Sequence, residues 1–485
     1  MKRNILSLAV AAGLAGVAAT ATAQLEMHVN DKGLGEALIF PFYSAENGND
    51  TYIHVVNTTM DSKAVKIRVI EGKNSVEVLD FNLYMSPEDH FSFVITETAD
   101  GEGAMLRTAD NSCTAPAIPA EGQPFVNFQY DGDSDDSLAR TKVGYVEVFE
   151  MGQIEDGSVI DVDITHDSAG EATCSEVIKA WSTGGEWLAD EEAFFQDNWN
   201  GGGLYGVSTV VNPEDAFAVG VDAIAIDDLV IASSGGAFHT DPGNLAPNWG
   251  VAGVNPNAVI FVDGGTQSFS FDDDSEGRHD AVSSLFMTAT MANDFVLDDG
   301  RLSATDWVVT MPTKRDYVNG RISAREPFAN VWSSTRSQAC EPFALDLWNR
   351  EESNVTITTG PQFSPKPDVE EVPDFVFCYE SGVLQMGDRP AIGPEAGTTV
   401  VDLADNVPYA EGWARVSFLP EDLNDPTEVG TRTIVDRDGK TITGLPVTGF
   451  SVTKLYNSQA KEGVEAFYAA ANNHKSTVVT SPVVR

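Results

Sequence analysis

Apolar and polar residues alternate in several short segments near the N-terminus. In residues 64–69, Val65, Ile67 and Val69 alternate with Lys66 and Arg68. A period of two places the apolar side chains on one face of a strand and the cations on the other. The same pattern predicts strands over 51–56, 76–84, 91–95 and 144–150. Turn residues occur at 46–49, 71–74 and 86–89. This spacing is typical of an antiparallel sandwich, immunoglobulin-like in size.

Helical spacing is clearest in the middle of the chain. Apolar residues recur at three- and four-residue intervals from Val282 to Ala292, which predicts a helix over 281–296 with Asp280 as its cap. Two shorter helices are predicted, one from Asp190 to Trp199 and one over 464–471.

The strand pattern returns in the second half of the chain. A hairpin is predicted over 258–271, turning at Asp263-Gly264-Gly265. Further strands are expected at 305–310, 354–358, 375–379, 413–418 and 450–455. Residues 99–141 read as a long inserted loop, and the proline-rich residues 361–373 as an exposed connector. We therefore expect a mainly β fold with two sandwich domains, residues 24–280 and 281–485, long inserted loops and one or two short helices.

The N-terminus has the three parts of a secretory signal peptide. Lys2 and Arg3 precede a short apolar stretch, which ends in the small-residue site Ala21-Thr22-Ala23. The stretch is short for a membrane span. We expect removal of residues 1–23 and a mature chain that works at the cell surface, outside the cell or in the periplasm.

The net charge of the chain limits the classes of partner that it can bind. The chain has 74 acidic and 29 basic residues, a formal net charge of −45. This field repels nucleic acid and anionic lipid and suits a salty exterior, where screening weakens self-repulsion. Lys314 and Arg315 are unusual neighbours in so acidic a chain. We expect them to form surface ion pairs with Glu351 and Glu352.

Four cysteines, an even number, are typical of disulfides in an exported protein. Three pairings are possible. We prefer Cys113–Cys174 with Cys340–Cys378, because each pair then lies within one half of the chain. No C-x-x-C spacing indicates a metal site.

The segment from Asp131 to Ser137 is rich in aspartate. Asp131, Asp133 and Asp135 have the spacing of the first ligands of an EF-hand loop, but Asp136 and Lys142 stand where that loop needs Gly and Glu. Two interpretations stay open: a looser calcium site formed by Asp131, Asp133, Asp135 and Asp136, or a solvated acidic loop. The second is favoured. Asp161, Asp163 and Asp167, and the run Asp272-Asp273-Asp274, raise the same question with weaker spacing.

No motif for a catalytic nucleophile, a phosphate-binding loop or a dinucleotide occurs in the sequence, so no catalytic residue is assigned. Eight tryptophans permit a different function, because exposed aromatic rings bind sugars. Trp181, Trp187 and Trp199 lie among Gly and Asp residues and are the better candidates for exposure. A secreted carbohydrate-binding or carbohydrate-active protein is therefore the alternative.

Three stretches, residues 79–87, 144–152 and 305–315, resemble a family of exported, uncharacterised proteins of Gram-negative bacteria that are described as cell-surface proteins. The resemblance implies export and surface exposure, and it transfers no catalytic residue. Together these features predict a non-enzymatic structural or interaction protein: a disulfide-braced β scaffold that presents loops to a protein or cell-surface partner, with calcium as a candidate stiffening ion. Exposed sheet edges would also allow self-association.

Overall fold

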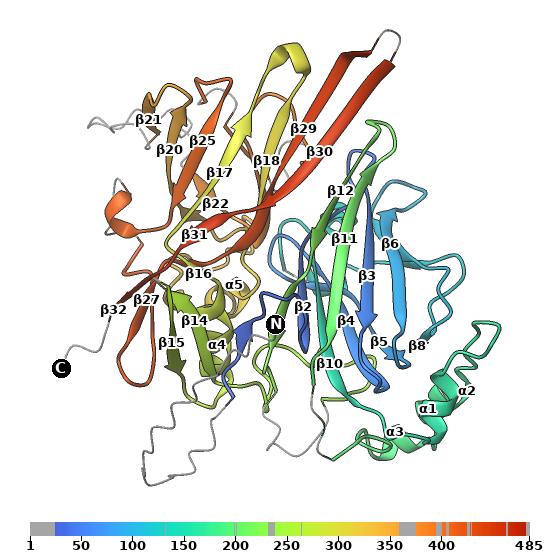
Figure 1. Ribbon diagram of the computed structural model, residues 1–485. Helices are drawn as coiled ribbons and strands as arrows, with labels where there is room; N and C mark the ends of the chain where they lie inside the picture. The colour runs from blue at the N-terminus through green and yellow to red at the C-terminus, as the bar shows by residue number, and fades with distance from the viewer. Residues whose placement is uncertain are drawn as a thin grey trace, which may run out of the picture.

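Antiparallel β-sheets make up most of the protein (Figure 1). The computed structural model describes residues 25–130, 132–197, 199, 201–230, 238–262, 264–357, 375–393, 400–403, 407–423, 427, 429–461 and 464–481. Four larger sheets form two sandwiches, and the expected mainly β fold is confirmed. The closer likeness to an immunoglobulin domain stays a prediction.

The N-terminal sandwich packs a seven-stranded sheet on a six-stranded sheet. The first has the order β1 (His28–Val29), β13 (Ile224–Asp227), β2 (Ala37–Ser44), β10 (Val143–Gln153), β4 (Lys63–Glu71), β5 (Glu77–Met85) and β8 (Cys113–Ala115). The second has the order β12 (Phe217–Asp222), β11 (Leu204–Asn212), β3 (Asp50–Asn57), β6 (His90–Glu97), β7 (Ala104–Arg107) and β9 (Gln123–Pro124). As the alternation predicted, Val65, Ile67 and Val69 are buried in the core between the two sheets.

The C-terminal sandwich packs two five-stranded sheets. One has the order β21 (Asn354–Ile357), β20 (Ala344–Asn349), β25 (Glu411–Ser417), β17 (Thr290–Val296) and β31 (Lys475–Thr477). The other has the order β24 (Val400–Asp402), β23 (Ser381–Gln385), β18 (Ala304–Thr310), β29 (Thr448–Lys461) and β30 (Val464–Asn473). Trp307, Leu345 and Val416 lie in the core between them.

Smaller elements cover the sheets. The strands are β14 (Asn257–Val262) with β15 (Gly265–Ser270), β16 (Met287–Thr288) with β28 (Leu445–Pro446), β19 (Glu341–Pro342) with β22 (Val376–Phe377), and β26 (Thr433–Val435) with β27 (Thr441–Thr443) and β32 (Val479–Ser481). The α-helices are α1 (Val159–Ile164), α2 (Ser175–Ala180), α3 (Glu186–Ala189), α4 (Ser275–Phe286) and α5 (Lys314–Val318). The hairpin predicted around Asp263-Gly264-Gly265 is β14–β15, and residues 99–141, expected to be a loop, contribute β7, β8 and β9. The proline-rich residues 361–373 lie outside the described residues.

The predicted helix over 281–296 is wrong in its second half. Helix α4 begins six residues earlier, where the Asp274 carboxylate accepts a hydrogen bond from the Gly277 amide (2.8 Å). It ends at Phe286, and β17 then pairs with β25 from Thr290 to Val296. The apolar residues after Phe286 fit a strand as well as a helix, and pairing between strands decides between the two. The expected domain boundary at residue 280 falls inside this helix.

Two shorter predicted helices are also wrong. Residues 464–471 belong to β30, because the long ladder with β29 outweighs the helix propensity of its alanines. Asp190 does not begin a helix but follows α3, where its amide donates to the Glu186 carbonyl (2.9 Å).

The two sandwiches are joined through an apolar contact and an inserted turn. Phe42, Val210 and Val219 of the first pack against Val308 and Phe450 of the second. The turn between β4 and β5 enters the C-terminal sandwich, where the Gly72 carbonyl accepts hydrogen bonds from the amides of residues 380 and 381 (2.9 and 2.8 Å). Because backbone bonds and apolar packing act together, we expect the two sandwiches to move as one body.

Lys314 contributes to this junction and is not the surface cation expected from the sequence. Its side chain is fully buried, and Nζ donates to the carbonyls of Ala339 (2.5 Å) and Tyr379 (3.4 Å). Burial lowers the pKa of this amine to about 8. The neighbouring Arg315 donates to the Asn74 carbonyl (2.7 Å) in the inserted turn. The surface pairing with Glu351 and Glu352 fails because α5 turns both cations into the junction.

Candidate functional site

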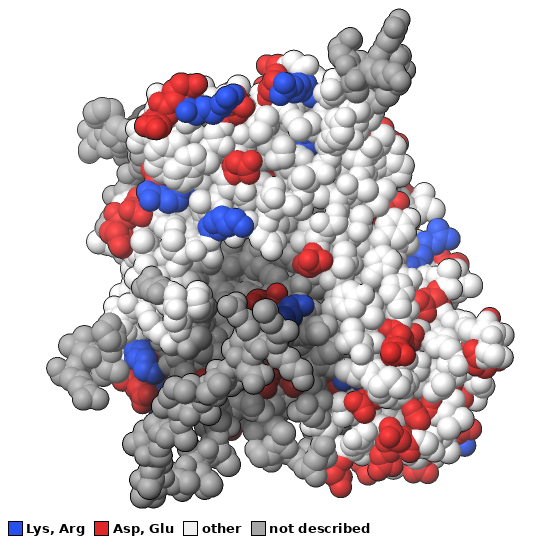
Figure 2. Space-filling model, in the orientation of Figure 1, with Lys and Arg blue, Asp and Glu red and all other residues white. Residues whose placement is uncertain are grey.

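A cleft of about 870 Å³ opens between the two sandwiches, and Figure 2 shows it as a hollow near the centre of the molecule. The N-terminal sandwich supplies β11, β13 and residues 29–34, and the opposite wall comes from residues 447–449 and 473–478. Among the described lining residues only Asp31, Lys32 and Asp222 carry a formal charge. In so acidic a chain, such a cleft fits an uncharged ligand or partner surface better than a cation.

His474 lines the cleft but has the environment of a structural residue. Its Nε2 donates to the Val308 carbonyl (2.9 Å), and its ring packs on Trp307 with centroids 5.2 Å apart. Burial lowers the pKa of this imidazole to about 4. The ring is therefore neutral near pH 7 and has a packing role.

A sheet face with few charged side chains continues outward from the cleft. It consists of the outward side chains of three neighbouring strands of the six-stranded sheet, which we call the β3–β6–β11 face. Its members are Tyr52, His54, Val56, His90, Ser92, Val94, Thr96, Tyr205, Val207, Thr209 and Val211. Tyr205 and Val207 also line the cleft, so the two surfaces are continuous.

On the outward positions of these three strands the one charged side chain is Asp50, at the first residue of β3. Asp222 of β12 and Arg107 of β7 lie opposite Val207 and Val94 at the two edges of the face. In Figure 2 the surface over β11 and β3 is mostly white, whereas acidic side chains gather below it around α1–α3. Tyr52 is 43% exposed and Tyr205 is 38% exposed, so aromatic rings contribute directly to this surface. Charged side chains are thus sparse on this face.

Two histidines meet near one end of this face. His54 on β3 and His90 on β6 are diagonal neighbours across the strand pair. The Nδ1 atom of His54 lies 3.1 Å from the Nε2 atom of His90, and the rings stack with centroids 5.2 Å apart. Partial burial and the neighbouring His90 lower the pKa of His54. One of the two nitrogens donates its N–H to the lone pair of the other, as the tautomers of the rings allow.

A second aromatic feature lies on the outer face of the C-terminal sandwich. Trp348 on β20 and Trp413 on β25 are directly opposite each other. Their rings stack with centroids 4.0 Å apart and planes 6° apart, and Trp413 is 42% exposed. Arg415 lies over the Trp348 ring and pairs with Asp346. An exposed indole with fixed polar neighbours is the kind of surface on which sugar rings stack.

The tryptophans expected to be exposed are buried instead. Trp187 has no exposed surface and stacks on Tyr84 with centroids 5.1 Å apart, while Trp199 is 7% exposed. Trp181 is half-buried, and its Nε1 donates to the Tyr84 hydroxyl (2.7 Å). Local Gly and Asp content is a poor guide here, because Trp181 and Trp187 pack with α1–α3 against the seven-stranded sheet. Trp199 lies in a separate cluster with Ala37 and Ile39 of the same sheet.

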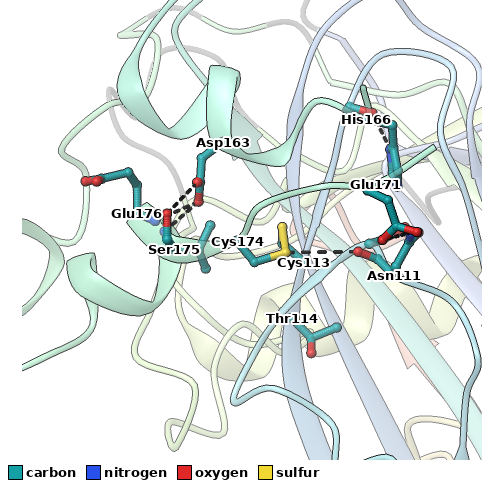
Figure 3. Close-up of a disulfide and its surroundings, with 12 residues drawn as sticks. Asn111, Cys113, Thr114, Asp163, His166, Glu171, Cys174, Ser175 and Glu176 are labelled. Carbon is teal, nitrogen blue, oxygen red and sulfur yellow. Dashed lines mark hydrogen bonds between the residues drawn. A yellow bond between two sulfur atoms is a disulfide. The ribbon is translucent and has the colours of Figure 1, made fainter. Parts of the chain in front are cut away.

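Both preferred disulfides, Cys113–Cys174 and Cys340–Cys378, are present. Figure 3 shows how the first joins β8 to the start of α2. On one side of the bond, Asn111 donates to Glu171 (3.1 Å). On the other, the Asp163 carboxylate accepts hydrogen bonds from the Ser175 hydroxyl (3.0 Å) and the Glu176 amide (2.7 Å). Asp163 thus anchors α2 rather than a cation.

Aspartates of the predicted calcium loop are engaged in ion pairs. Asp133 accepts from Arg140 (2.8 Å) and from Trp332 Nε1 (2.9 Å), and Asp135 accepts from Lys73 (2.5 Å). Asp136 is exposed, and Asp131 lies outside the described residues. In the part of the chain that the structure describes, no group of three or more His, Cys, Asp and Glu side chains could hold a metal ion. The calcium site stays a prediction.

The run Asp272-Asp273-Asp274 has local structural roles. Asp274 caps α4, Asp273 pairs with Arg278 (2.6 Å), and Asp272 lies 3.2 Å from Arg437.

The outer face of the seven-stranded sheet buries the charges that the alternation predicted. Lys66 pairs with Asp80 (2.9 Å), and Arg68 pairs with Glu77 and Glu147 (both 2.6 Å). The Lys66 side chain is fully buried and also donates to the carbonyl of residue 244 (3.1 Å). The alternation itself is confirmed, but both faces of this sheet are covered, so its charges are structural.

Comparisons of the chain with protein-family models, curated proteins and solved structures found no match. The resemblance to exported cell-surface proteins therefore stays a prediction. No helix among the described residues is long and apolar enough to cross a membrane.

Proposed function

We propose that the protein is an exported, non-enzymatic interaction protein that binds a protein partner through the β3–β6–β11 face and the adjoining cleft. One observation carries the proposal. A chain with 74 acidic residues carries a single charged side chain, Asp50 at the start of β3, on the outward positions of three adjacent strands. A largely neutral surface with exposed tyrosines and half-buried valines has the composition found at the centre of protein interfaces.

Desolvation explains why the face suits a protein partner. Removing water from a charged side chain costs free energy that a single new contact rarely offsets. Tyrosine, valine, threonine and serine cost less to desolvate, and aromatic rings contribute strongly to binding. The acidic surface around the face would repel most acidic partners, so a partner with a neutral patch and a neutral or basic border is favoured.

The scaffold supports this function by holding the face rigid. The two disulfides brace both halves of the chain, and the inserted turn and the apolar junction tie the two sandwiches together. A preorganised surface loses little conformational entropy on binding. Disulfides also suit the oxidising compartments in which exported proteins work, and this agrees with the signal peptide predicted for residues 1–23.

Site-specific photocrosslinking in intact cells tests the proposal. A benzoylphenylalanine replaces Tyr205 on the face or, as the control, Ile178, which is 57% exposed on α2. The expected result is one discrete adduct from position 205, none from 178, and loss of the adduct when Val207→Asp adds a charge to the face. Absence of a discrete adduct from position 205 would overturn the proposal. An adduct of twice the chain mass would identify a second copy as the partner.

Carbohydrate binding is a second candidate, favoured by the Trp348–Trp413 stack. The exposed Trp413 ring offers a flat apolar surface, and Asp294 lies opposite it on β17 as a hydrogen-bond acceptor for hydroxyl groups. Aromatic stacking combined with a carboxylate acceptor is a common way to bind neutral sugars.

Affinity electrophoresis in gels that contain neutral polysaccharides tests this second function. Binding retards the wild-type protein, and Trp413→Ala should abolish the retardation. Phe261→Ala, which removes a 72% exposed ring elsewhere, is the matched control and should migrate like the wild type. Unchanged migration of the wild type on every polysaccharide tested would count against the sugar-binding function.

A further inference from the structure

We infer that His54 and His90 form a two-histidine binding site for a divalent transition-metal ion of the zinc and copper class. The inference rests on their geometry: Nδ1 of His54 and Nε2 of His90 are 3.1 Å apart on adjacent strands of one sheet. This site goes beyond the proposed partner-binding function and does not depend on it.

The spacing of the two nitrogens matches a metal chelate. Zinc binds imidazole nitrogen at about 2.0–2.1 Å, so two ligands at an angle between about 90° and 110° are separated by roughly 2.9–3.4 Å. The observed 3.1 Å lies inside this range. Metal binding breaks the hydrogen bond between the rings, and the donor imidazole takes the tautomer with its proton on the other nitrogen, so both rings bind as neutral ligands. Two small ring rotations suffice, because both side chains already converge.

The sheet fixes both ligands in advance. His54 pairs with Ser92 across the β3–β6 ladder, and His90 pairs with Val56, so four backbone positions set the distance between the rings. The side chain of His54 is half-buried and that of His90 is exposed, which leaves the site open to an incoming ion. Water would fill the remaining coordination positions, because no third His, Cys, Asp or Glu of the described chain completes the site.

The surroundings favour imidazole chemistry over carboxylate chemistry. The other titratable side chains on this face of β3 and β11 are Asp50, Tyr52 and Tyr205. Asp222 and Arg107 border the face on β12 and β7, and Asp110 accepts a hydrogen bond from the Ser92 amide (3.1 Å). A hard cation such as calcium needs several oxygen ligands, whereas imidazole binds zinc, copper and nickel. The two imidazole ligands therefore select zinc, copper and nickel ions over calcium.

Calorimetric titration of the mature protein with Zn²⁺ tests the site. Millimolar calcium and 0.15 M NaCl in the buffer occupy carboxylate sites and screen the net charge. We expect one zinc ion per chain under these conditions. His54→Gln and His90→Gln should each weaken binding at least tenfold, and His28→Gln, which changes a histidine beside Asp228, should leave it unchanged. Circular dichroism confirms that the variants fold.

Two further readouts make the test decisive. Binding should be lost as pH falls below about 6, because protonated imidazoles repel the ion and each other. Cu²⁺ bound to the wild type should show coupling to two nitrogens in its electron paramagnetic resonance spectrum. A wild-type protein that binds no zinc in calcium would overturn the inference. So would a His54→Gln/His90→Gln double variant that keeps wild-type affinity.

Discussion

Lys63 on β4 and Glu150 on β10 form an ion pair from which solvent is excluded. The Nζ and Oε1 atoms are 2.5 Å apart, and neither side chain has exposed surface. The other carboxylate oxygen of Glu150 accepts a hydrogen bond from the Gly202 amide (2.8 Å). The pair therefore fixes two central strands to the segment that leads into β11, and through it to the β3–β6–β11 face.

Breaking this pair should destabilise the fold strongly. Lys63→Met leaves the Glu150 carboxylate buried without its cation, and we expect a loss of about 3–5 kcal/mol in the free energy of unfolding. Replacing both residues by Met and Leu removes the unpaired charge and should recover most of the loss. Urea unfolding followed by fluorescence measures each step. A single variant as stable as the wild type would show that the pair contributes little.

Stability should fall as pH rises toward 8, because of Glu36. Burial, with Glu150 as the next cause, raises the pKa of Glu36 from 4.5 to about 8. The folded protein thus keeps a proton that the unfolded chain releases above about pH 4.5. The contribution of this proton to the free energy of unfolding is complete below about pH 4.5 and is lost as pH rises through about 8. Between these two values the free energy of unfolding falls by up to ~1.4 kcal/mol per pH unit.

Glu36→Gln isolates this effect. The glutamine keeps an acceptor for the Val230 amide, which is 2.7 Å from the Glu36 carboxylate, but does not titrate. Between pH 5.5 and 7.5 the variant should show a shallower fall in the free energy of unfolding than the wild type. Glu214→Gln, on an exposed turn, serves as the control and should keep the wild-type slope. Equal slopes for Glu36→Gln and wild type would contradict the assignment.

Added salt should stabilise the protein. With 74 acidic and 29 basic residues the folded chain repels itself, and raising NaCl from 0.1 to 1 M shortens the screening length from about 10 to about 3 Å. We expect a higher thermal midpoint at 1 M. Neutralising the exposed Glu155, Asp156 and Glu192 should raise the midpoint in low salt and reduce its salt dependence. An identical salt response in both proteins would argue against surface repulsion as the cause.

Strand positions were readable from the sequence where one face of the strand is apolar. Val65, Ile67 and Val69 illustrate this, because period-two burial has a direct local signature. The preferred pairing of the cysteines was also correct, and it rested on each pair lying within one half of the chain. What covers the opposite face has no local signature: nothing near Lys66 indicates that the backbone around Asn244 lies over it.

The candidate sites were harder to predict for the same reason. His54 and His90 are 36 residues apart and become neighbours only through the register of β3 with β6. Trp348 and Trp413 likewise meet only through the β20–β25 ladder, whereas Trp187, chosen for its polar surroundings in sequence, is buried. Register depends on tertiary packing, and a shift of one residue would send each ring to the opposite face.

Calcium should not raise the thermal midpoint more than magnesium does at equal ionic strength. The reason lies in the loop around Asp133 and Asp135, whose carboxylates already pair with Arg140 and Lys73 (2.8 and 2.5 Å). An incoming ion would have to break both pairs before it gained its oxygen ligands. Thermal unfolding in millimolar calcium, in magnesium and in excess chelator measures the difference, because a ligand that binds only the folded state raises its midpoint by mass action. A calcium-specific rise that Asp135→Asn abolishes would show instead that the loop opens to bind the ion, and would locate the calcium site predicted from the sequence there.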